Sequence, residues 1–206
     1  MSVKQSYDQW ALQYDDSVNK TRDMEAIAIR EILSGKQFSN CLEIGCGTGK
    51  NSDFLTGICG HVTALDISEE MLMKAKAKIA AENIEFLQYD VQGYWNFKHS
   101  PFQLITCSLV LEHIEQLDLL FKNASANLLK GGLLYAGELH PFKQYMGSKA
   151  RFDEADRVHV VECYIHHFSD FVSAGMENGL RVVQVKEYFD DEVQIPRILA
   201  LLLEKV

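Results

Sequence analysis

The sequence predicts a doubly wound α/β fold with a mostly parallel, seven-stranded sheet, and three observations support this prediction. Short apolar runs alternate with helical patterns up to residue 138, as expected for parallel strands joined by right-handed helical crossovers. The 206 residues contain no repeat, no low-complexity tract and only three prolines, so a single domain over 1–206 is expected. The last two apolar runs follow each other directly, which predicts a C-terminal antiparallel hairpin at or near the sheet edge.

The elements are expected in chain order from apolar periodicity and from helix start and stop signals. Helices are predicted over 24–33, 50–59, 69–81 and 117–129, with Ser68 as the N-cap of the third and two glycines after the fourth. Strands are predicted over 41–44, 61–65, 84–89, 102–109 and 133–138. The hairpin strands are 181–189 and 197–205, joined by the acidic loop DDEVQIP at 190–196.

Composition and charge restrict the function. The formal net charge is −9, which disfavours nucleic acid as a partner, because binding to a phosphate backbone depends on Lys and Arg. The start MSVKQSYDQW has no basic cluster before an apolar run, and no segment approaches the roughly 18 apolar residues of a membrane span, so a cytoplasmic protein without a membrane partner is expected. Five cysteines without a CxxC pair argue against a disulfide scaffold and a zinc site. A small-molecule or protein-bound substrate is expected.

Three glycines stand between the first predicted strand and the next helix, in the stretch CLEIGCGTGKNSDFL over 41–55. Gly45, Gly47 and Gly49 permit positive φ angles and let a ligand approach the bare backbone beside free helix N–H groups. Ligands of such sheets bind at the carboxyl ends of the strands. The dinucleotide pattern GxGxxG fails, because its third glycine would fall at Lys50 or Ser52.

Carboxylates mark the ends of the first three predicted strands. Glu43, Asp66 and Asp90 are expected at the same sheet edge, where alternation would otherwise bury apolar residues. Carboxylates accept hydrogen bonds, so they suit a ligand rich in hydroxyl, amino and ammonium groups and repel a pyrophosphate. Asp66 is also compatible with a role as a helix-start acid, and Asp90 with a strand-end turn.

With these motifs the chain resembles the class I S-adenosylmethionine-dependent methyltransferases, especially the small bacterial enzymes that act on metabolites. The resemblance rests on EIGCGTG at 43–49, LDIS at 65–68, DV at 90–91, SLVLEHI at 108–114 and LKGGLL at 129–134, and it covers nearly the whole chain. It implies a Rossmann-like methyltransferase fold and S-adenosylmethionine as the cofactor.

The resemblance also implies roles for individual residues. The glycine loop would pass under the methionine and ribose portions, Asp66 would accept both ribose hydroxyls, and Tyr14 in YDQWALQYD would close over the cofactor. For His113, core packing and cofactor contact are equally open. The implied cofactor-binding set is Tyr14, Glu43, Gly45, Cys46, Gly47, Gly49, Asp66, Ile67, Met71, Asp90, Val91, Ser108, Leu109 and His113.

The segment 139–168 is long for a connection and polar in its first half, which is typical of a substrate-pocket wall or lid. Candidate acid/base residues are Glu138, His140 and His166, although a structural role is equally open for each histidine. Basic and phenolic groups that can hold a substrate carboxylate or phosphate are Lys143, Tyr145, Lys149 and Arg151.

The sequence therefore predicts methyl transfer from S-adenosylmethionine to an oxygen, nitrogen or carbon acceptor on a small molecule or carrier-bound metabolite, with no metal required. A hydroxyl or carbon acceptor needs a base, whereas a carboxylate acceptor needs none. The chain reads CSLV at 107–110 where base-amine methyltransferases carry an N/D-P-P-Y motif, which argues against nucleic acid. Alternatives are a non-catalytic regulatory protein that binds S-adenosylmethionine or S-adenosylhomocysteine, and a Rossmann-type reductase, against which the missing glycine counts.

Overall fold

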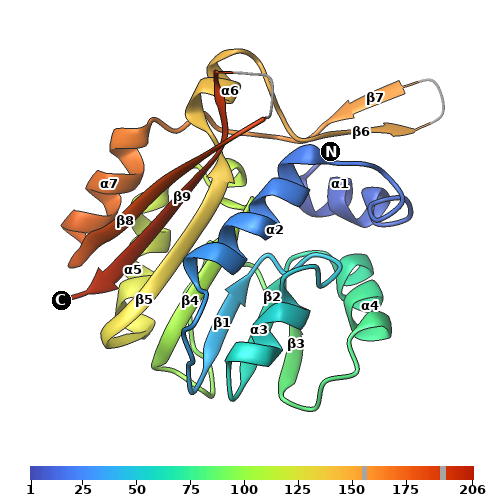
Figure 1. The fold of residues 1–206 in the computed structure, drawn as a ribbon. Helices are drawn as coiled ribbons and strands as arrows, with labels where there is room; N and C mark the ends of the chain where they lie inside the picture. Colours follow the sequence, from blue (N-terminus) through green and yellow to red (C-terminus); the bar gives the residue numbers. More distant parts are fainter. Residues whose placement is uncertain (155–156, 191–193) are drawn as a thin grey trace.

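The computed structural model describes residues 1–154, 157–190 and 194–206, and its centre is a seven-stranded sheet (Figure 1). The strand order is β3-β2-β1-β4-β5-β9-β8. Strands β1 to β5 are parallel, whereas β9 is antiparallel to β5 and to β8. The bounds are β1 Cys41–Ile44, β2 Val62–Asp66, β3 Ile84–Gln88, β4 Phe102–Ser108, β5 Leu128–Leu139, β8 Leu180–Phe189 and β9 Pro196–Lys205. The predicted fold class is confirmed, and β8 of the expected hairpin forms the sheet edge.

Helices cover both faces of the sheet (Figure 1). One apolar core lies under α2 (Lys20–Ile32), α3 (Ser52–Ile58) and α4 (Glu69–Lys78). A second core lies under α5 (Leu117–Asn127) and α7 (Phe168–Glu177) on the opposite face. All four residues of β1 are buried, as expected for a parallel strand covered on both sides.

The topology fixes where a ligand can bind. Strand β1 pairs with β2 on one side and β4 on the other, so the chain changes its direction of growth along the sheet at β1. In open α/β sheets the crevice at such a switch point, outside the carboxyl ends of the strands, is the usual ligand site. The glycine loop begins at this point, directly after Ile44.

Helix α1 (Val3–Trp10) was not among the predicted elements, because its sequence is polar and short. Its start is fixed by a capping box in which Ser2 Oγ accepts the Gln5 N–H and the Gln5 side chain accepts the Ser2 N–H. Trp10 then packs in a small apolar cluster with Phe152 and Val161. Tertiary contacts therefore stabilise a helix that its own sequence only weakly favours.

Several predicted boundaries differ from the structure by a few residues, and two of the differences have a clear local cause. Helix α4 ends at Lys78 rather than at residue 81, because Ile79 adopts an extended conformation with ψ 111°. Strand β5 begins at Leu128, where helix was predicted through 129, because Leu128 pairs with Phe102 and its carbonyl accepts a hydrogen bond from Lys205 Nζ. The two glycines thus lie within β5 instead of ending α5, which stops at Asn127.

The predicted insertion contains regular structure of its own. It comprises α6 (Pro141–Tyr145) and an antiparallel ribbon of β6 (Arg151–Glu154) and β7 (Arg157–Val160). Figure 1 shows this ribbon beside α1, and the Trp10 and Phe152 rings stack at 5.4 Å between centroids. Positions 155–156 of the predicted insertion and 191–193 of the predicted acidic loop lie outside the described residues.

None of the helices in the described part of the chain has both the length and the apolar character that crossing a bilayer requires.

Candidate functional site

A cavity of about 1040 Å³, including space open to solvent, lies at the carboxyl edge of the sheet. Its walls come from the ends of β1, β2 and β4, the loop after β3, and the segment around α1. With the exception of Gly49, every residue of the predicted cofactor-binding set lines it: Tyr14, Glu43, Gly45, Cys46, Gly47, Asp66, Ile67, Met71, Asp90, Val91, Ser108, Leu109 and His113.

The glycine loop shapes the floor of this cavity. Gly45 has φ 69°, and a Cβ atom added there would lie 2.1 Å from Val110 Cγ2, so the close approach of the two segments requires glycine. Gly47 has φ 54°, but an added Cβ would meet nothing within 4 Å. Gly47 therefore leaves open space on the cavity side. Gly49 faces away from the cavity, toward Ile79 and Ala75 of the α4 region.

Backbone groups hold the Asp66 carboxylate at the end of β2. Its two oxygens accept the Gly47 N–H and the Ser68 N–H, each at 2.8 Å. Burial raises the pKa of Asp66 to about 6, although these backbone hydrogen bonds act in the opposite direction. Each oxygen retains capacity to accept a further hydrogen bond from a ligand. The predicted N-cap is also present, since Ser68 Oγ accepts the Met71 N–H.

Two further carboxylates lie deeper in the cavity wall. Glu43 is buried, accepts a hydrogen bond from Ser52 Oγ at 2.5 Å, and has its pKa raised to about 8 by burial. Glu25 of α2 is also buried, and burial raises its pKa; it accepts hydrogen bonds from Asn51 Nδ2 at 2.8 Å and Tyr135 OH at 3.1 Å. Buried carboxylates beside a cavity favour a positively charged ligand.

The end of β4 carries a strained residue. Leu109 has φ 56°, which is unusual for a residue with a side chain, and its N–H donates to the Gly137 carbonyl at 2.8 Å. Such backbone strain concentrates at functional sites. After β3, Asp90 lines the cavity, and its side chain also accepts the Gln92 N–H at 3.0 Å. Asp90 therefore stabilises a turn and at the same time lies where it can contact a ligand.

Both tyrosines of the YDQWALQYD stretch line the cavity, although only Tyr14 was predicted. Burial raises the pKa of Tyr14 to about 12, and the Arg22 guanidinium lies 4.6 Å from its ring centroid. The Tyr7 hydroxyl is 2.8 Å from His113 Nε2, and His113 Nδ1 is 2.7 Å from the Glu162 carbonyl oxygen. Because a carbonyl only accepts, Nδ1 of His113 carries the proton, and Nε2 of the neutral ring is then an acceptor.

The structure does not bring the three predicted acid/base residues to the cavity. Glu138 Oε1 accepts the Val110 and Leu111 N–H groups, and burial raises its pKa well above the usual range. His140 caps α6 through the Phe142 N–H and contacts Glu187 at 2.9 Å. His166 Nε2 lies 2.7 Å from the Ile114 carbonyl. Each side chain is engaged in holding a turn or helix end, which does not support a catalytic role.

The predicted anion-binding groups of the insertion also lie away from the cavity. Lys143 pairs with Asp190 at 3.7 Å, and the Tyr145 hydroxyl is 2.8 Å from His167 Nδ1. No residue of 139–154 or 157–168 lines the cavity. Within this segment, the β6–β7 ribbon packs beside α1 through the Trp10–Phe152 stack.

Cavity residues that the sequence did not reveal come mostly from the N-terminal third: Val3, Tyr7, Arg22, Glu25, Thr48, Lys50 and Asn51. Glu25 had a detectable signal, because it lies on the same helical face as Ala28, Ile29 and Ile32, where an apolar residue is expected. Val3, Tyr7 and Arg22 have no comparable pattern, since they reach the cavity through the placement of α1 and α2, whereas Thr48, Lys50 and Asn51 belong to the stretch between β1 and α3 that carries the predicted glycines.

Residues 41–132 match the model of a family described as a methyltransferase domain. The ubiquinone biosynthesis O-methyltransferase of Coxiella burnetii is 28% identical over 168 residues, which cover 74% of this chain and 67% of that protein. The malonyl-[acyl-carrier protein] O-methyltransferase 2 of Ilyobacter polytropus is 25% identical over 196 residues, 94% of this chain and 69% of that protein. Another ubiquinone biosynthesis O-methyltransferase, 31% identical, is matched over only about half of its length, 48%.

Among solved structures, the N-methyltransferase NodS of Bradyrhizobium japonicum in complex with S-adenosyl-L-homocysteine aligns with a TM-score of 0.76. The alignment covers 100% of this chain and 99% of that chain, at 19% sequence identity. At this identity the structural likeness establishes a shared fold. The match to the family model identifies residues 41–132 as similar to a methyltransferase domain.

Proposed function

The chain is a class I S-adenosylmethionine-dependent methyltransferase, and on that premise we propose that it methylates a small molecule or a carrier-bound metabolite at oxygen, nitrogen or carbon. The observation that carries the proposal is the single cavity wall formed by the glycine loop, the Asp66 carboxylate and the buried Glu43. An oxygen acceptor is favoured, because two of the relatives are described as O-methyltransferases.

The residues of the cavity fit S-adenosylmethionine as the cofactor. Asp66 supplies acceptor capacity for ribose hydroxyls, and the open space above Gly47 admits a ligand against bare backbone. Ile67 and Met71 give an apolar wall for adenine, with Asp90 and Val91 at its edge. Glu25 and Glu43 supply negative charge for a cationic amino acid portion. The bound cofactor supplies a methyl group whose sulfur leaving group needs no further activation.

The protein's own contribution is alignment and exclusion of water. The proposed cover is α1 with Tyr7 and the turn after it with Tyr14, and the 139–168 segment acts behind it through the Trp10–Phe152 stack. Ser68 Oγ donates to Asp8 Oδ1 and Thr48 Oγ1 donates to Asp15 Oδ1, each at 2.7 Å. These hydrogen bonds tie the cover to the loops that carry the cofactor-binding groups.

For a hydroxyl acceptor, the proposed base is His113 in place of the histidines singled out from the sequence. It lines the cavity, and its Nε2 accepts a hydrogen bond from Tyr7 in the tautomer that Glu162 selects. A proton taken from the acceptor, directly or through the Tyr7 hydroxyl, would reside on this nitrogen. A carboxylate acceptor would need no such step.

The test is calorimetric titration with S-adenosylhomocysteine, followed by a mass-spectrometric screen of a metabolite extract. A product about 14 Da heavier, the mass of one CH₂, should form only with S-adenosylmethionine and the protein. Gly47→Val is the control variant, because it strains a position at φ 54° and places a side chain in the cavity. Binding without turnover on any extract would favour the non-catalytic regulatory alternative. Absence of binding would contradict the proposal.

His113→Asn and Tyr7→Phe then test the base once the acceptor is known. With a hydroxyl acceptor, His113→Asn should lower kcat by about 10²–10⁴-fold. An unchanged kcat with such an acceptor would exclude His113 as the base.

A further inference from the structure

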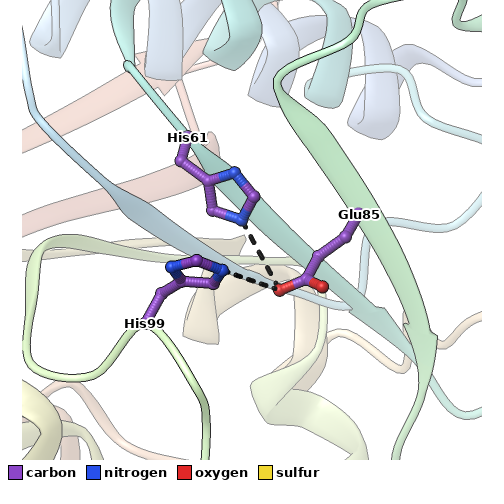
Figure 2. Close-up of side chains that lie close together, drawn as sticks. All are labelled: His61, Glu85 and His99. Carbon is purple, nitrogen blue, oxygen red and sulfur yellow. Dashed lines mark hydrogen bonds and ion pairs between the residues drawn. The ribbon is translucent and has the colours of Figure 1, made fainter.

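Three side chains with metal-ligand chemistry converge at the amino end of the sheet, far from the cofactor cavity. Figure 2 shows His61, immediately before β2, Glu85 of β3, and His99 from the loop before β4. The side chains are 28%, 36% and 33% exposed, so the group is reachable from solvent without being on a flat surface. None of the three contributes to the cavity described above.

The distances between these groups are long for hydrogen bonds. His61 Nε2 and His99 Nε2 lie 3.5 Å and 3.7 Å from the same oxygen, Glu85 Oε1. Good N–H···O hydrogen bonds measure about 2.7–3.2 Å. Ligands bonded to zinc at about 2.0–2.1 Å in a tetrahedron are instead about 3.3 Å apart. One potential ligand atom from each residue lies within 4.8 Å of the other two. A small movement of the three side chains toward one another would therefore bring these atoms to the spacing of metal ligands.

We infer that His61, Glu85 and His99 bind a divalent transition metal ion of the zinc type, with the remaining coordination position taken by water or an external ligand. Two imidazole nitrogens and one carboxylate oxygen suit Zn²⁺, Co²⁺ or Ni²⁺. The same set does not suit Mg²⁺ or Ca²⁺, which prefer oxygen ligands throughout. No sequence pattern indicates this site, because its residues are 24 and 14 positions apart and include no cysteine.

Neighbouring groups orient two of the three ligands. Thr63 Oγ1 donates to Glu85 Oε1 at 3.0 Å, which fixes the carboxylate while leaving the other oxygen free of any hydrogen bond described here. Asn40 Nδ2 donates to the His99 carbonyl at 2.8 Å and holds the backbone of that loop. Such supporting hydrogen bonds are a regular feature of metal sites.

A second group of similar composition, Glu112, His113 and Cys163, is a weaker candidate. Both ring nitrogens of His113 are already engaged, by Tyr7 and by the Glu162 carbonyl. A metal there would have to displace these contacts. At the first group, the contacts of His61 and His99 with Glu85 are those that a metal would replace.

The position of the site indicates a structural effect rather than a catalytic one. His61 and Asp66 are at opposite ends of β2, and five residues of extended chain span about 16 Å. A metal at His61, Glu85 and His99 would join β2, β3 and the segment that leads into β4. Since β3 is the sheet edge on this side, the ion would fasten an edge strand to the rest of the sheet.

The experiment uses the full chain, treated with a chelator and dialysed, and titrates it with ZnCl₂ in a calorimeter. One Zn²⁺ per chain is expected, together with a raised Tm. His61→Ala, His99→Ala and Glu85→Gln should each weaken Zn²⁺ binding by about tenfold or more, since even supporting residues contribute that much. Circular dichroism of the metal-free variants verifies that each one folds. Cys163→Ser, in the second group, should keep the affinity of the unmodified chain.

Two results would overturn the inference. Equal Zn²⁺ affinity in the unmodified chain and in all three variants would show that His61, Glu85 and His99 do not bind the metal and form only ion pairs with one another. A loss of binding in Cys163→Ser, with retention in His61→Ala, would move the metal to the second group. The outcome is independent of methyltransferase activity, because it is read from metal binding and Tm alone.

Discussion

Polar side chains at the two ends of strand β2 are held by different kinds of contact. At the carboxyl end, backbone N–H groups of the glycine loop and of the start of α4 fix the Asp66 carboxylate at 2.8 Å, and α1 lies over it. At the amino end, His61 faces other side chains, with Glu85 at 3.5 Å and the His99 ring at 4.1 Å between centroids (Figure 2). Backbone donors organise the first end before any ligand arrives. The second end has the right chemical groups at a wider spacing, and we infer that a cation completes it.

Electrostatics separates the two ends further. Burial raises the pKa of Asp66 to about 6 and that of Glu43 to about 8. The amino-end group is more exposed to solvent, where surface ion pairs contribute about 0–1 kcal/mol. Stability should therefore depend on pH through the buried carboxylates, whereas the amino end should respond mainly to added metal.

The largest expected effect comes from uncovering the carboxyl end. Phe152→Ala removes the ring that stacks on Trp10, and we expect it to weaken docking of α1 by about 3 kcal/mol, the low end for truncating a buried phenylalanine. Amide hydrogen exchange in α1 should accelerate by about 100-fold. Val158→Ala, on an exposed position of the same ribbon, is the matched control. Unchanged exchange in α1 would show that the ribbon does not hold the cover.

Glu43→Gln should stabilise the cofactor-free protein at high pH. The folded-state pKa of about 8 lies above the ordinary value of 4.5 for a glutamate, so folding favours the protonated form of Glu43. The contribution of Glu43 to the stability of the unmodified protein is thus fully present below about pH 4.5 and is lost as the pH rises through 8. The variant lacks this loss, and we expect a gain of about 2–4 kcal/mol at pH 9 after the cost of burying an amide.

Urea unfolding from pH 5 to pH 9 measures this difference between Glu43→Gln and the unmodified chain. Glu85→Gln at the amino end is the control and should change the metal-free stability by less than about 1 kcal/mol. A constant difference between Glu43→Gln and the unmodified chain across this range would contradict the raised pKa of Glu43.

Asp66→Ala should weaken binding of S-adenosylhomocysteine by about 1–3 kcal/mol, the range for hydrogen bonds to a charged acceptor. Asp66→Asn separates two causes, because it keeps one acceptor for the Gly47 or Ser68 N–H but lacks the charge. The matched control is Glu70→Ala, an exposed acid in the first turn of α4. Isothermal titration calorimetry reads all three affinities, and an Asp66→Ala affinity equal to that of Glu70→Ala would reject the ribose assignment.

The smallest effect is a fractional proton release on cofactor binding. A cationic ligand beside Glu43 and Asp66 lowers their pKa values, so up to about one proton should leave between pH 6 and 8. Calorimetry in buffers of different ionisation enthalpy measures the number of protons released on binding. S-adenosylmethionine, with its sulfonium charge, should release more than S-adenosylhomocysteine, and Glu43→Gln should release less. Equal enthalpies in every buffer would argue against this coupling.

Much of the cofactor cavity was predictable because its signals are local. The spacing of Gly45, Gly47 and Gly49 and the acids at three strand ends lie in short stretches, and parallel topology brings such ends together. Gly49 illustrates the limit of the pattern, since it belongs to the loop but packs toward Ile79. The assigned chemical roles of these residues remain predictions until a ligand is bound.

The acid/base prediction failed to identify cavity residues for a different reason. Glu138 lies near the end of β5 and His140 follows it, so both are near the correct sheet edge. However, their side chains hydrogen-bond to nearby backbone groups and to Glu187. The position of a residue at a strand end predicts where its backbone lies. It does not predict which way the side chain points. Tyr7 and Glu25, which do reach the cavity, come from helices that pack across the sheet.

The sequence by itself determined the α/β alternation, the closing antiparallel strands and the glycine loop flanked by acids, because periodicity and backbone permissiveness act over a few residues. Only the tertiary structure decided that α1 lines the cavity with the β6–β7 ribbon packed beside it, that His113 faces Tyr7, and that His61, Glu85 and His99 meet. These groupings depend on packing between segments distant along the chain, and a pattern in one segment carries no information about the partner that packing will place beside it.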